Sequence, residues 1–508
     1  MSLKKNVVAN YLGQGWRALM GFIFIPAYIH YLGIESFALV GIYGMLQAWL
    51  ALLDMGMRPT LGREMARFTA GRHDVQFVRD LLRSVVTVGL ATVSIIAAGI
   101  FAASGWLAAD WLTASRLPVE EVARAINWIG IVIACRFIEN IYVHCMVGLQ
   151  QQVTQNAVGA ALATLRGLGV VGVLAWVSPT IEAFFVWQGL VSLLSIAVFS
   201  RLVYRILPKS PRPARFSWPA LSHIWRFARG MLAITALALL LTQIDKILLS
   251  RWLTLEDFGY YALAAVVAIA LKFVPGPVAT AIYPRFTELA TRVGGESALR
   301  ALYHQVAQLV TVLMGSAALL LIAFAHPVLL VWTGNRVVAD ASAPILSVLA
   351  LGTLLNGLMW IPHQLQLAYG WTALAIRTNA IAAACMVPLL FWLVPRYGAI
   401  GAAWAWVGLN LGYLAFTAQF MHRRLLVGEK WRWYFEDVAT PLVAAAAVAA
   451  VCSWVIPADL GKAAQLFALL STAVLILSAA SLAAPRVREQ VFRQLRTTSG
   501  SISGRTRR

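Results

Sequence analysis

The chain has 508 residues, of which 60% are hydrophobic and only 12% are charged, and its formal net charge is +20. This composition lies outside the range of soluble globular proteins. The positive charge does not indicate a nucleic-acid-binding protein, because no basic stripe interleaved with stacking aromatic residues occurs outside the apolar segments.

The cysteines and the N-terminus carry little chemical information. The four cysteines, at 135, 145, 385 and 452, lie within apolar segments and lack metal-site spacing. They are expected to act as small hydrophobic residues, and the sequence indicates no metal and no cofactor. The basic N-terminus leads into an apolar segment of full length without a short apolar core and cleavage site, so it is predicted to be an uncleaved first helix.

Apolar segments of membrane-spanning length recur along the whole chain. A transmembrane helix needs about 20 apolar residues, and these runs are too long for the strands of a membrane barrel. The sequence therefore predicts an all-α polytopic membrane protein with about 14 transmembrane helices. They are expected near residues 7–31, 37–57, 83–104, 125–148, 154–176, 181–203, 229–251, 258–283, 303–332, 342–368, 372–394, 398–421, 436–456 and 462–484.

Lys and Arg are distributed unequally between the connections. If the N-terminus is cytoplasmic, that side carries twenty-nine of them and the opposite side carries six. Cytoplasmic loops of membrane proteins are enriched in Lys and Arg, so both termini are predicted to face the cytoplasm from the cytoplasmic (inner) membrane. Most of the net charge then orients the protein and rests against anionic lipid headgroups.

Internal similarity indicates two related halves. LGIESF at 32–37 matches LTLEDF at 253–258, and IEAFFVWQGL at 181–190 matches IGAAWAWVGL at 400–409. Matches at nearly one offset indicate a duplication with both halves in the same orientation. The predicted organisation is a six-helix bundle at 1–204, a Pro- and Arg-rich cytoplasmic linker at 205–228, a second six-helix bundle at 229–424, two additional transmembrane helices at 425–484 and a basic cytoplasmic tail at 485–508.

Several stretches resemble one family of membrane transporters. They include YLGIESFALVGIYGML from residue 31, QIDKILLSRWLTLEDFGYYALA from residue 243 and IPHQLQLAYG from residue 361. The chain resembles, from about residue 7 to 424, the polysaccharide-transport or oligosaccharide flippase family (Wzx-type) of the multidrug/oligosaccharidyl-lipid/polysaccharide exporter superfamily.

The resemblance implies a fold and a transport activity. Two six-helix bundles would flank a central cationic cavity that opens alternately to the two membrane faces. The implied cargo is a polyprenyl-pyrophosphate-linked oligosaccharide, moved from the cytoplasmic to the outer leaflet without enzymatic chemistry. Membrane lipids, H⁺ or Na⁺, a glycan polymerase and a chain-length regulator are the expected partners.

Neutralising a pyrophosphate inside the membrane requires cationic side chains, and the spans contain several. A charged residue at this depth usually faces a bundle interior or a water-filled cavity. The alternative is that each one reaches the interface or binds backbone carbonyls. The candidate pyrophosphate ligands within the spans are Arg17, Arg166, Lys272 and Arg377.

The span near 229–251 contains an adjacent acid and base, Asp245 and Lys246. Their side chains point about 100° apart on a helix, so they need not pair with each other. Asp245 is the best candidate for a proton or coupling-ion site. Lys246 is either a phosphate ligand or the partner of an acid on another helix.

Other polar residues have candidate roles in sugar binding and gating. Gln364, beside Pro362, is a candidate sugar ligand together with Gln366 and Asn356. Asp54 and Arg58 have the spacing of an intrahelical pair, for which the family resemblance favours a gate; capping and anchoring of the helix end is the alternative. Arg136 and Glu139, three residues apart, are expected to form an internal pair.

Three other functions compete with the oligosaccharide flippase. A lipid II flippase would share a basic cavity. A cation-coupled multidrug exporter of the same superfamily would favour acids and aromatic residues, whereas the intramembrane charges here are mostly basic. A membrane glycan polymerase or ligase would be expected to carry a large outer loop with catalytic residues, and the longest outer connection, near 105–124, is short.

Overall fold

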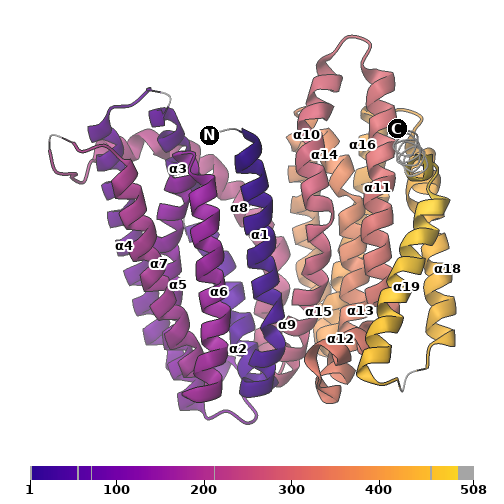
Figure 1. Ribbon diagram of the computed structural model, residues 1–508, viewed down its shortest axis with the longest axis horizontal. Coiled ribbons are helices and arrows are strands. Elements are labelled where there is room, and N and C mark those ends of the chain that lie inside the picture. Colours follow the sequence, from indigo (N-terminus) through magenta and orange to yellow (C-terminus); the bar gives the residue numbers. More distant parts are fainter. Residues whose placement is uncertain (1–2, 54–56, 70, 211, 458–459, 490–508) are drawn as a thin grey trace, which may run out of the picture. The chain divides into compact units, whose positions relative to one another are not determined.

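The computed structural model describes residues 3–53, 57–69, 71–210, 212–457 and 460–489 (Figure 1). Within these ranges every regular element is a helix, apart from one isolated β-bridge between Thr113 and Thr254. Ten of the described helical segments are long and apolar enough to cross a membrane. The structure therefore confirms an all-α, multi-pass membrane protein, and the count of fourteen spans stays a prediction.

The chain divides into two compact units, Met1–Gly259 and Tyr260–Arg508. The helices that begin in the first unit are α1 (Leu3–Ile23), α2 (Ile25–Leu53), α3 (Met57–Thr69), α4 (Val75–Trp106), the π-helix η1 (Leu107–Trp111), α5 (Val119–Gly148), α6 (Gln152–Trp176), α7 (Ile181–Ile206), α8 (Trp218–Trp252) and α9 (Leu255–Ala270), which continues into the second unit. The sequence analysis placed the bundle and linker boundaries at 204 and 228 from the internal repeats, whereas the two compact units are defined by contacts within the chain. The boundaries at 204 and 228 stay predictions.

The helices of the second unit follow in the same numbering. They are the 3₁₀ turn η2 (Leu271–Phe273), α10 (Pro275–Thr291), α11 (Glu296–Ala323), α12 (Ala325–Thr333), α13 (Arg336–Leu358), α14 (Trp360–Ala368), α15 (Thr372–Gly412), the π-helix η3 (Tyr413–Thr417), α16 (Ala418–Arg424), α17 (Lys430–Arg432), the π-helix η4 (Trp433–Ala439), α18 (Thr440–Val455) and α19 (Lys462–Ala483).

Proline and glycine set the helix breaks. α1 ends at Ile23 and α2 begins at Ile25, because Pro26 lacks an amide hydrogen and its ring clashes with the preceding turn. Inside α2 the chain turns at Gly33 (φ 77°, ψ 167°), and inside α15 it turns at Gly398 (φ 59°, ψ −140°). Only glycine adopts such angles readily. The two turns fall where the sequence predicts connections between spans.

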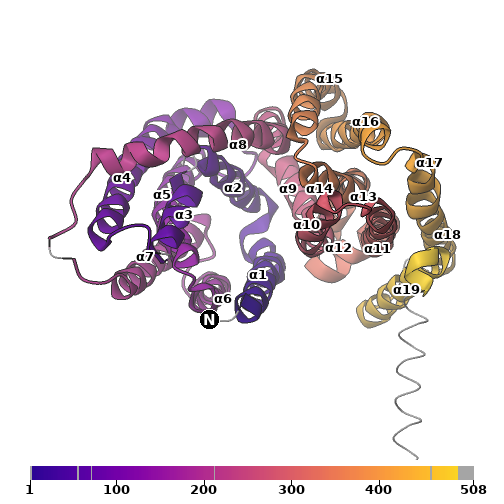
Figure 2. The same cartoon turned by 90° about the horizontal axis from the view of Figure 1, so that it is seen from above.

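In the first unit, α5 packs against α3, α4 and α7. The approach of α3 to α5 depends on small residues, since a Cβ added to Gly148 would lie 2.2 Å from the carbonyl oxygen of Gly62. α8 runs alongside α2 and α4 (Figure 2). It begins earlier than the predicted span, because the Ser217 side chain caps it by accepting a hydrogen bond from Ala220 N.

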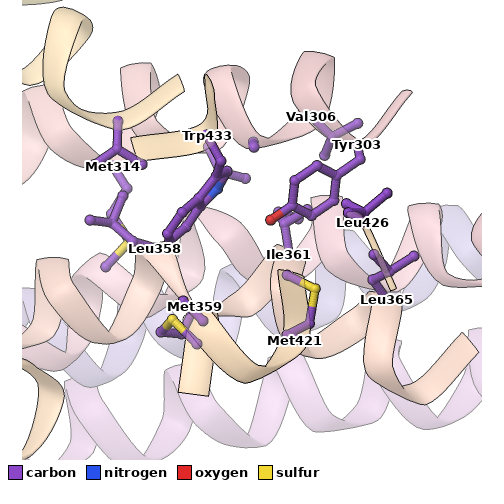
Figure 3. Packing of buried hydrophobic residues seen from close by; sticks show 14 of the residues in the cluster. Tyr303, Val306, Met314, Leu358, Met359, Ile361, Leu365, Met421, Leu426 and Trp433 are labelled. Atoms are coloured by element: carbon purple, nitrogen blue, oxygen red, sulfur yellow. The ribbon is translucent and has the colours of Figure 1, made fainter. Parts of the chain in front are cut away.

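The core of the second unit forms around α11, which packs against α13, α18 and α19. Figure 3 shows Tyr303, Met314 and Trp433 within this core. A fully buried side chain of α11, His304, contacts Asp437 of η4 through Nδ1 and Glu429, just before α17, through Nε2 (3.0 Å). Polar contacts therefore hold α11 to the segment that leads into α18, while apolar side chains pack α11 against α18 and α19.

Two acidic residues of the matching LGIESF and LTLEDF stretches hold one connection in the first unit. The Glu35 carboxylate accepts hydrogen bonds from the backbone amides of Ser115 (2.5 Å) and Arg116 (3.1 Å). The Arg116 side chain pairs with Glu256 at 3.7 Å. Leu255 N also donates to Thr113 O (2.9 Å), so the connection after η1 is attached to both α2 and α9.

α3 carries a buried carboxylate outside the membrane-spanning segments. Glu64 is fully buried and accepts hydrogen bonds from Arg63 (2.9 Å) and Arg67 (3.3 Å), while His73 Nε2 lies 2.7 Å from Oε2. Burial alone would raise the pKa of Glu64, but the hydrogen bonds from His73 and Arg63 and the charges of Arg67 and Arg63 lower that pKa below its ordinary value of 4.5. The ionised carboxylate therefore stabilises the contact between α3 and His73, in the turn that leads into α4.

This lowered pKa predicts an acid-dependent loss of stability. Because the pKa of Glu64 is lower in the folded state than in the unfolded state, its ionised form increases the free energy of unfolding above pH 4.5. This contribution is lost as the pH falls through the folded-state pKa. Thermal unfolding in detergent between pH 7 and pH 4 should therefore show a smaller acid-induced decrease in Glu64→Gln than in the wild type. Glu288→Gln, at an exposed pair with Arg285, is the control. An unchanged acid response in Glu64→Gln would contradict the assignment.

Candidate substrate-binding and coupling sites

Arg17 lies in α1 and is held by neutral groups. Its Nη2 donates to Asn156 Oδ1 of α6 at 3.0 Å, and its Nε donates to Gly13 O at 3.1 Å. Asn156 is oriented in turn, since its Nδ2 donates to Asn10 Oδ1 (2.6 Å) and Gln152 O (2.8 Å). Within the described part of the chain, no carboxylate forms an ion pair with Arg17, which is half-buried.

α1 and α6 approach closely at this position. A Cβ added to Gly13 would lie 2.4 Å from Asn156 Oδ1, so a larger residue could not occupy the position without displacing the amide. The guanidinium group has five N–H donors, and the contacts with Asn156 and Gly13 use two of them. The geometry therefore presents a cation whose charge is solvated by amides and is not cancelled by them.

Arg166 has a different environment, although it is also a candidate ligand. It is buried in α6, and its Nη2 donates to Glu139 Oε2 of α5 at 2.8 Å. Its Nη1 donates to Ser192 Oγ of α7 at 2.9 Å. Glu139 also accepts from Ser195 Oγ (2.7 Å) and pairs with Arg136 at 3.5 Å.

This network contains two guanidinium groups and one carboxylate. The predicted internal pair between Arg136 and Glu139 is confirmed. Arg166, however, joins the same carboxylate, so it holds α5, α6 and α7 together as well as carrying charge. Its hydrogen bonds show that Arg166 positions α5 and α7 relative to α6. A contact between Arg166 and substrate stays a prediction.

The acid and base of α8 lie in the first unit, and both are half-buried. Lys246 Nζ donates to Gln243 Oε1 at 3.0 Å and to Thr242 O at 3.4 Å, both within its own helix. The cation is thus solvated by its own helix. α8 packs against α2, α3 and α4, so Asp245 belongs to the same unit as Arg17 and Arg166.

Two cationic candidates lie in the second unit. Lys272 is half-buried in η2, and its Nζ lies 5.2 Å from the centre of the Trp406 ring, a cation–π distance. Trp406 itself is closely packed, because a Cβ added to Gly352 would lie 2.4 Å from its ring. Arg377 is exposed on α15. Neither residue is assigned a substrate contact by its geometry.

Gln364 lines a polar pocket of about 330 Å³ in the second unit. Amide and hydroxyl groups of α13, α14, α15 and η3 converge there. Asn356 Nδ2 donates to Asn410 Oδ1 at 2.9 Å, and Tyr413 Oη donates to Asn379 Oδ1 at 2.8 Å. The pocket thus gathers Gln364 with Gln366 and Asn356, while the part played by Tyr413 was not predicted.

The proposed gate is only partly described. Asp54 lies outside the described residues. Arg58 belongs to α3, but its side chain is not among those that the structure describes. The pairing of Asp54 with Arg58 therefore stays a prediction.

The fold is that of known membrane transporters. The lipid II flippase MurJ in an inward closed conformation is similar with a TM-score of 0.64 over 93% of this chain and 98% of that chain, at 12% identity. The MATE multidrug transporter DinF-BH is similar with a TM-score of 0.59 over 84% and 96%, at 16% identity. These likenesses show that the chain shares the helical fold of these membrane transporters.

Sequence comparison then gives the family. Residues 3–290 match the family model described as "Polysaccharide biosynthesis protein", and the chain belongs to that family. A protein of Shigella flexneri named "Putative O-antigen transporter" is 20% identical over 431 residues, which cover 84% of this chain and 99% of that protein. The predicted resemblance is confirmed at the level of the family.

The buried network predicts which substitution harms folding. Glu139→Gln would leave Arg136 and Arg166 without their shared carboxylate, and breaking a buried ion pair on one side costs about 3–5 kcal/mol. We expect a large decrease in thermal stability in detergent, measured by fluorescence-detected size exclusion after heating. Glu182→Gln, at an exposed pair with Arg124, should have little effect. Equal stability of the two variants would show that the network does not hold α5, α6 and α7 together.

Proposed function

We propose that this protein is a flippase that moves a polyprenyl-pyrophosphate-linked oligosaccharide across the cytoplasmic membrane by alternating access. The observation that carries the proposal is Arg17, a cation on α1, the helix of the first predicted span, which Asn156 Oδ1 and Gly13 O hold in place. A lone charge in the bilayer costs at least about 2.5 kcal/mol. Such a cost is offset when an anionic group binds beside the charge.

The chemistry of Arg17 matches a phosphate. Its planar fork of N–H donors suits bidentate contact with phosphate oxygens. Asn10 and Asn156 fix the orientation of the group and leave the charge uncompensated within the described residues, whereas Arg166 already shares Glu139. Arg17 is therefore the first choice for a pyrophosphate ligand, with Lys246, Lys272 and Arg377 as further candidates along the path.

The comparisons support the choice of cargo. The chain belongs to a family described by polysaccharide biosynthesis. The Shigella flexneri relative is named for O-antigen transport, and MurJ is a flippase of another lipid-linked saccharide by its name. A transporter, rather than a membrane polymerase or ligase, is the activity that these names support. In our proposal both termini face the cytoplasm, as the distribution of Lys and Arg predicts.

Replacement of Arg17 tests the cargo assignment. Arg17→Gln should reduce flipping at least tenfold, because loss of one partner of a buried charged contact costs about 2 kcal/mol or more. Arg17→Lys should retain part of the activity, since it keeps the charge and loses the bidentate geometry. The measurement is lipid-linked oligosaccharide trapped on the inner leaflet, together with surface glycan. Arg124→Gln, at an exposed pair, is the matched control; normal export by Arg17→Gln at wild-type abundance would refute the proposal.

We also infer that transport is coupled to H⁺ or Na⁺ through Asp245. A carboxylate on a membrane-embedded helix can bind either ion and lose its charge cost by doing so. In proteoliposomes, Asp245→Asn should transport at the same rate with and without an imposed pH or Na⁺ gradient, whereas the wild type responds to the gradient. Asp257→Asn, an exposed acid near the start of α9, is the control. Transport by Asp245→Asn that still follows the gradient would remove this residue from the coupling role.

A further inference from the structure

The polar pocket of the second unit adjoins an apolar pocket of about 450 Å³. The two share Thr378, Tyr413 and Thr417, so they meet at these side chains, and we call them the polar arm and the apolar arm of one site. Each arm is within the roughly 300–1,000 Å³ range of ligand sites. All the described residues that line the two arms belong to the second unit.

The polar arm contains a buried acceptor that lacks a donor. Gln366 is 1% exposed, yet within the described residues its Oε1 accepts no hydrogen bond. Leaving such a group unsatisfied is unfavourable, and a hydroxyl group in the pocket would satisfy it. Amides and hydroxyls line the same space together with His363, Met359, Trp360 and Ala375, and among the described residues no Asp, Glu, Lys or Arg lines it. The arm therefore fits an uncharged, hydroxylated group.

The apolar arm is a groove along α15 with a glycine floor. Gly408 and Gly412, one turn apart, lie on the same face of the helix and line the groove beside Leu389 and Phe416. A Cβ added to Gly412 would meet no atom within 4 Å. The space is therefore open where a larger residue would fill it, and its walls are hydrocarbon.

The polarity of the lining changes along the first part of α15. The polar arm includes Ala375 and Asn379, near the start of α15 and of a predicted span. The apolar arm extends along α15 from Thr378 to Leu389, about 16 Å at 1.5 Å per residue, and it also follows the later segment from Gly408 to Phe420. A lipid with its headgroup near the start of α15 and one chain in this groove has the same order of polarity along that helix.

We propose that the second unit binds a membrane lipid with an uncharged, hydroxylated headgroup, such as a glycosyl diacylglycerol. The headgroup occupies the polar arm and donates to Gln366, and one hydrocarbon chain occupies the groove over Gly408 and Gly412. A phosphate-bearing lipid fits less well, because its charge would fall at Thr378, Tyr413 and Thr417, and neither Lys nor Arg lines the space in the described part of the chain. In this proposal Gln364, Gln366 and Asn356, which the sequence analysis made candidate sugar ligands of the cargo, instead surround the headgroup of a bound lipid, and Arg17 belongs to the other unit.

Photocrosslinking tests the proposal on the full chain. The protein is placed in phosphatidylcholine nanodiscs with a glucosyl diacylglycerol that carries a diazirine in one acyl chain, and adducts are mapped by mass spectrometry. We expect adducts within 378–389 and 408–420, displaced by unlabelled glucosyl lipid. Gly412→Leu, which fills the groove, should reduce them at least fivefold, and Gln366→Leu about threefold to tenfold.

Matched variants and a second probe make the result decisive. Gly99→Leu places the same side chain where an added Cβ also meets nothing within 4 Å, and Gln465→Leu removes another buried glutamine, so both should label like the wild type. Thermal unfolding confirms that each variant is folded. Undiminished labelling in folded Gly412→Leu would overturn the proposal. A second pair of results would also overturn it: phosphatidylglycerol with the same reactive chain labels the protein equally, and Gln366→Leu has no effect on labelling. The groove would then accept any acyl chain, whatever its headgroup.

Discussion

The cost of placing a guanidinium group in hydrocarbon shapes the first unit. A membrane offers no water to solvate the charge, so the protein must supply the solvating groups itself. Arg136 and Arg166 share the carboxylate of Glu139, which also binds Ser195. Arg17 is solvated by carbonyl oxygens of an asparagine and of the backbone. The shared carboxylate ties α5, α6 and α7 together. The amide contacts of Arg17 leave its positive charge available to bind an anion.

Close helix packing makes the second solution possible. Membrane helices associate through small residues that let their backbones approach. Gly13 lets α1 contact Asn156, and on α6 the glycines at 167 and 169 receive the rings of Phe24 and Trp187. Phe24 lies at the break before Pro26, and its ring packs against Gly167 of α6. The kink between α1 and α2 therefore places the ring that contacts α6. The position of Arg17 thus depends on residues that carry no charge.

Much of the fold was predictable from the sequence, because spanning length and Pro or Gly punctuation are local properties. The i,i+3 pair of Arg136 and Glu139 was predictable for the same reason. The partners of Arg17 and Arg166 were not, since they lie 139 and 27 residues away and are chosen by helix packing. Gln364 was noticed as a polar residue in an apolar run, whereas Tyr413 resembles any core aromatic until its hydroxyl is seen bonded to Asn379.

The two acids at the matching stretches bind the same connection with unequal strength. Glu35 holds backbone amides of residues 115 and 116 from a buried position, while Glu256 pairs with the largely exposed Arg116 side chain at 3.7 Å. An exposed pair of this kind contributes little. The Leu255 amide also donates to Thr113 O (2.9 Å), so the connection after η1 is attached to both α2 and α9. Any movement that separates α2 from α9 would have to break this backbone hydrogen bond as well as the Arg116–Glu256 pair, and the charge-assisted bonds to Glu35 would favour retention of the connection on α2. The helix that keeps this connection would then carry it along during the movement.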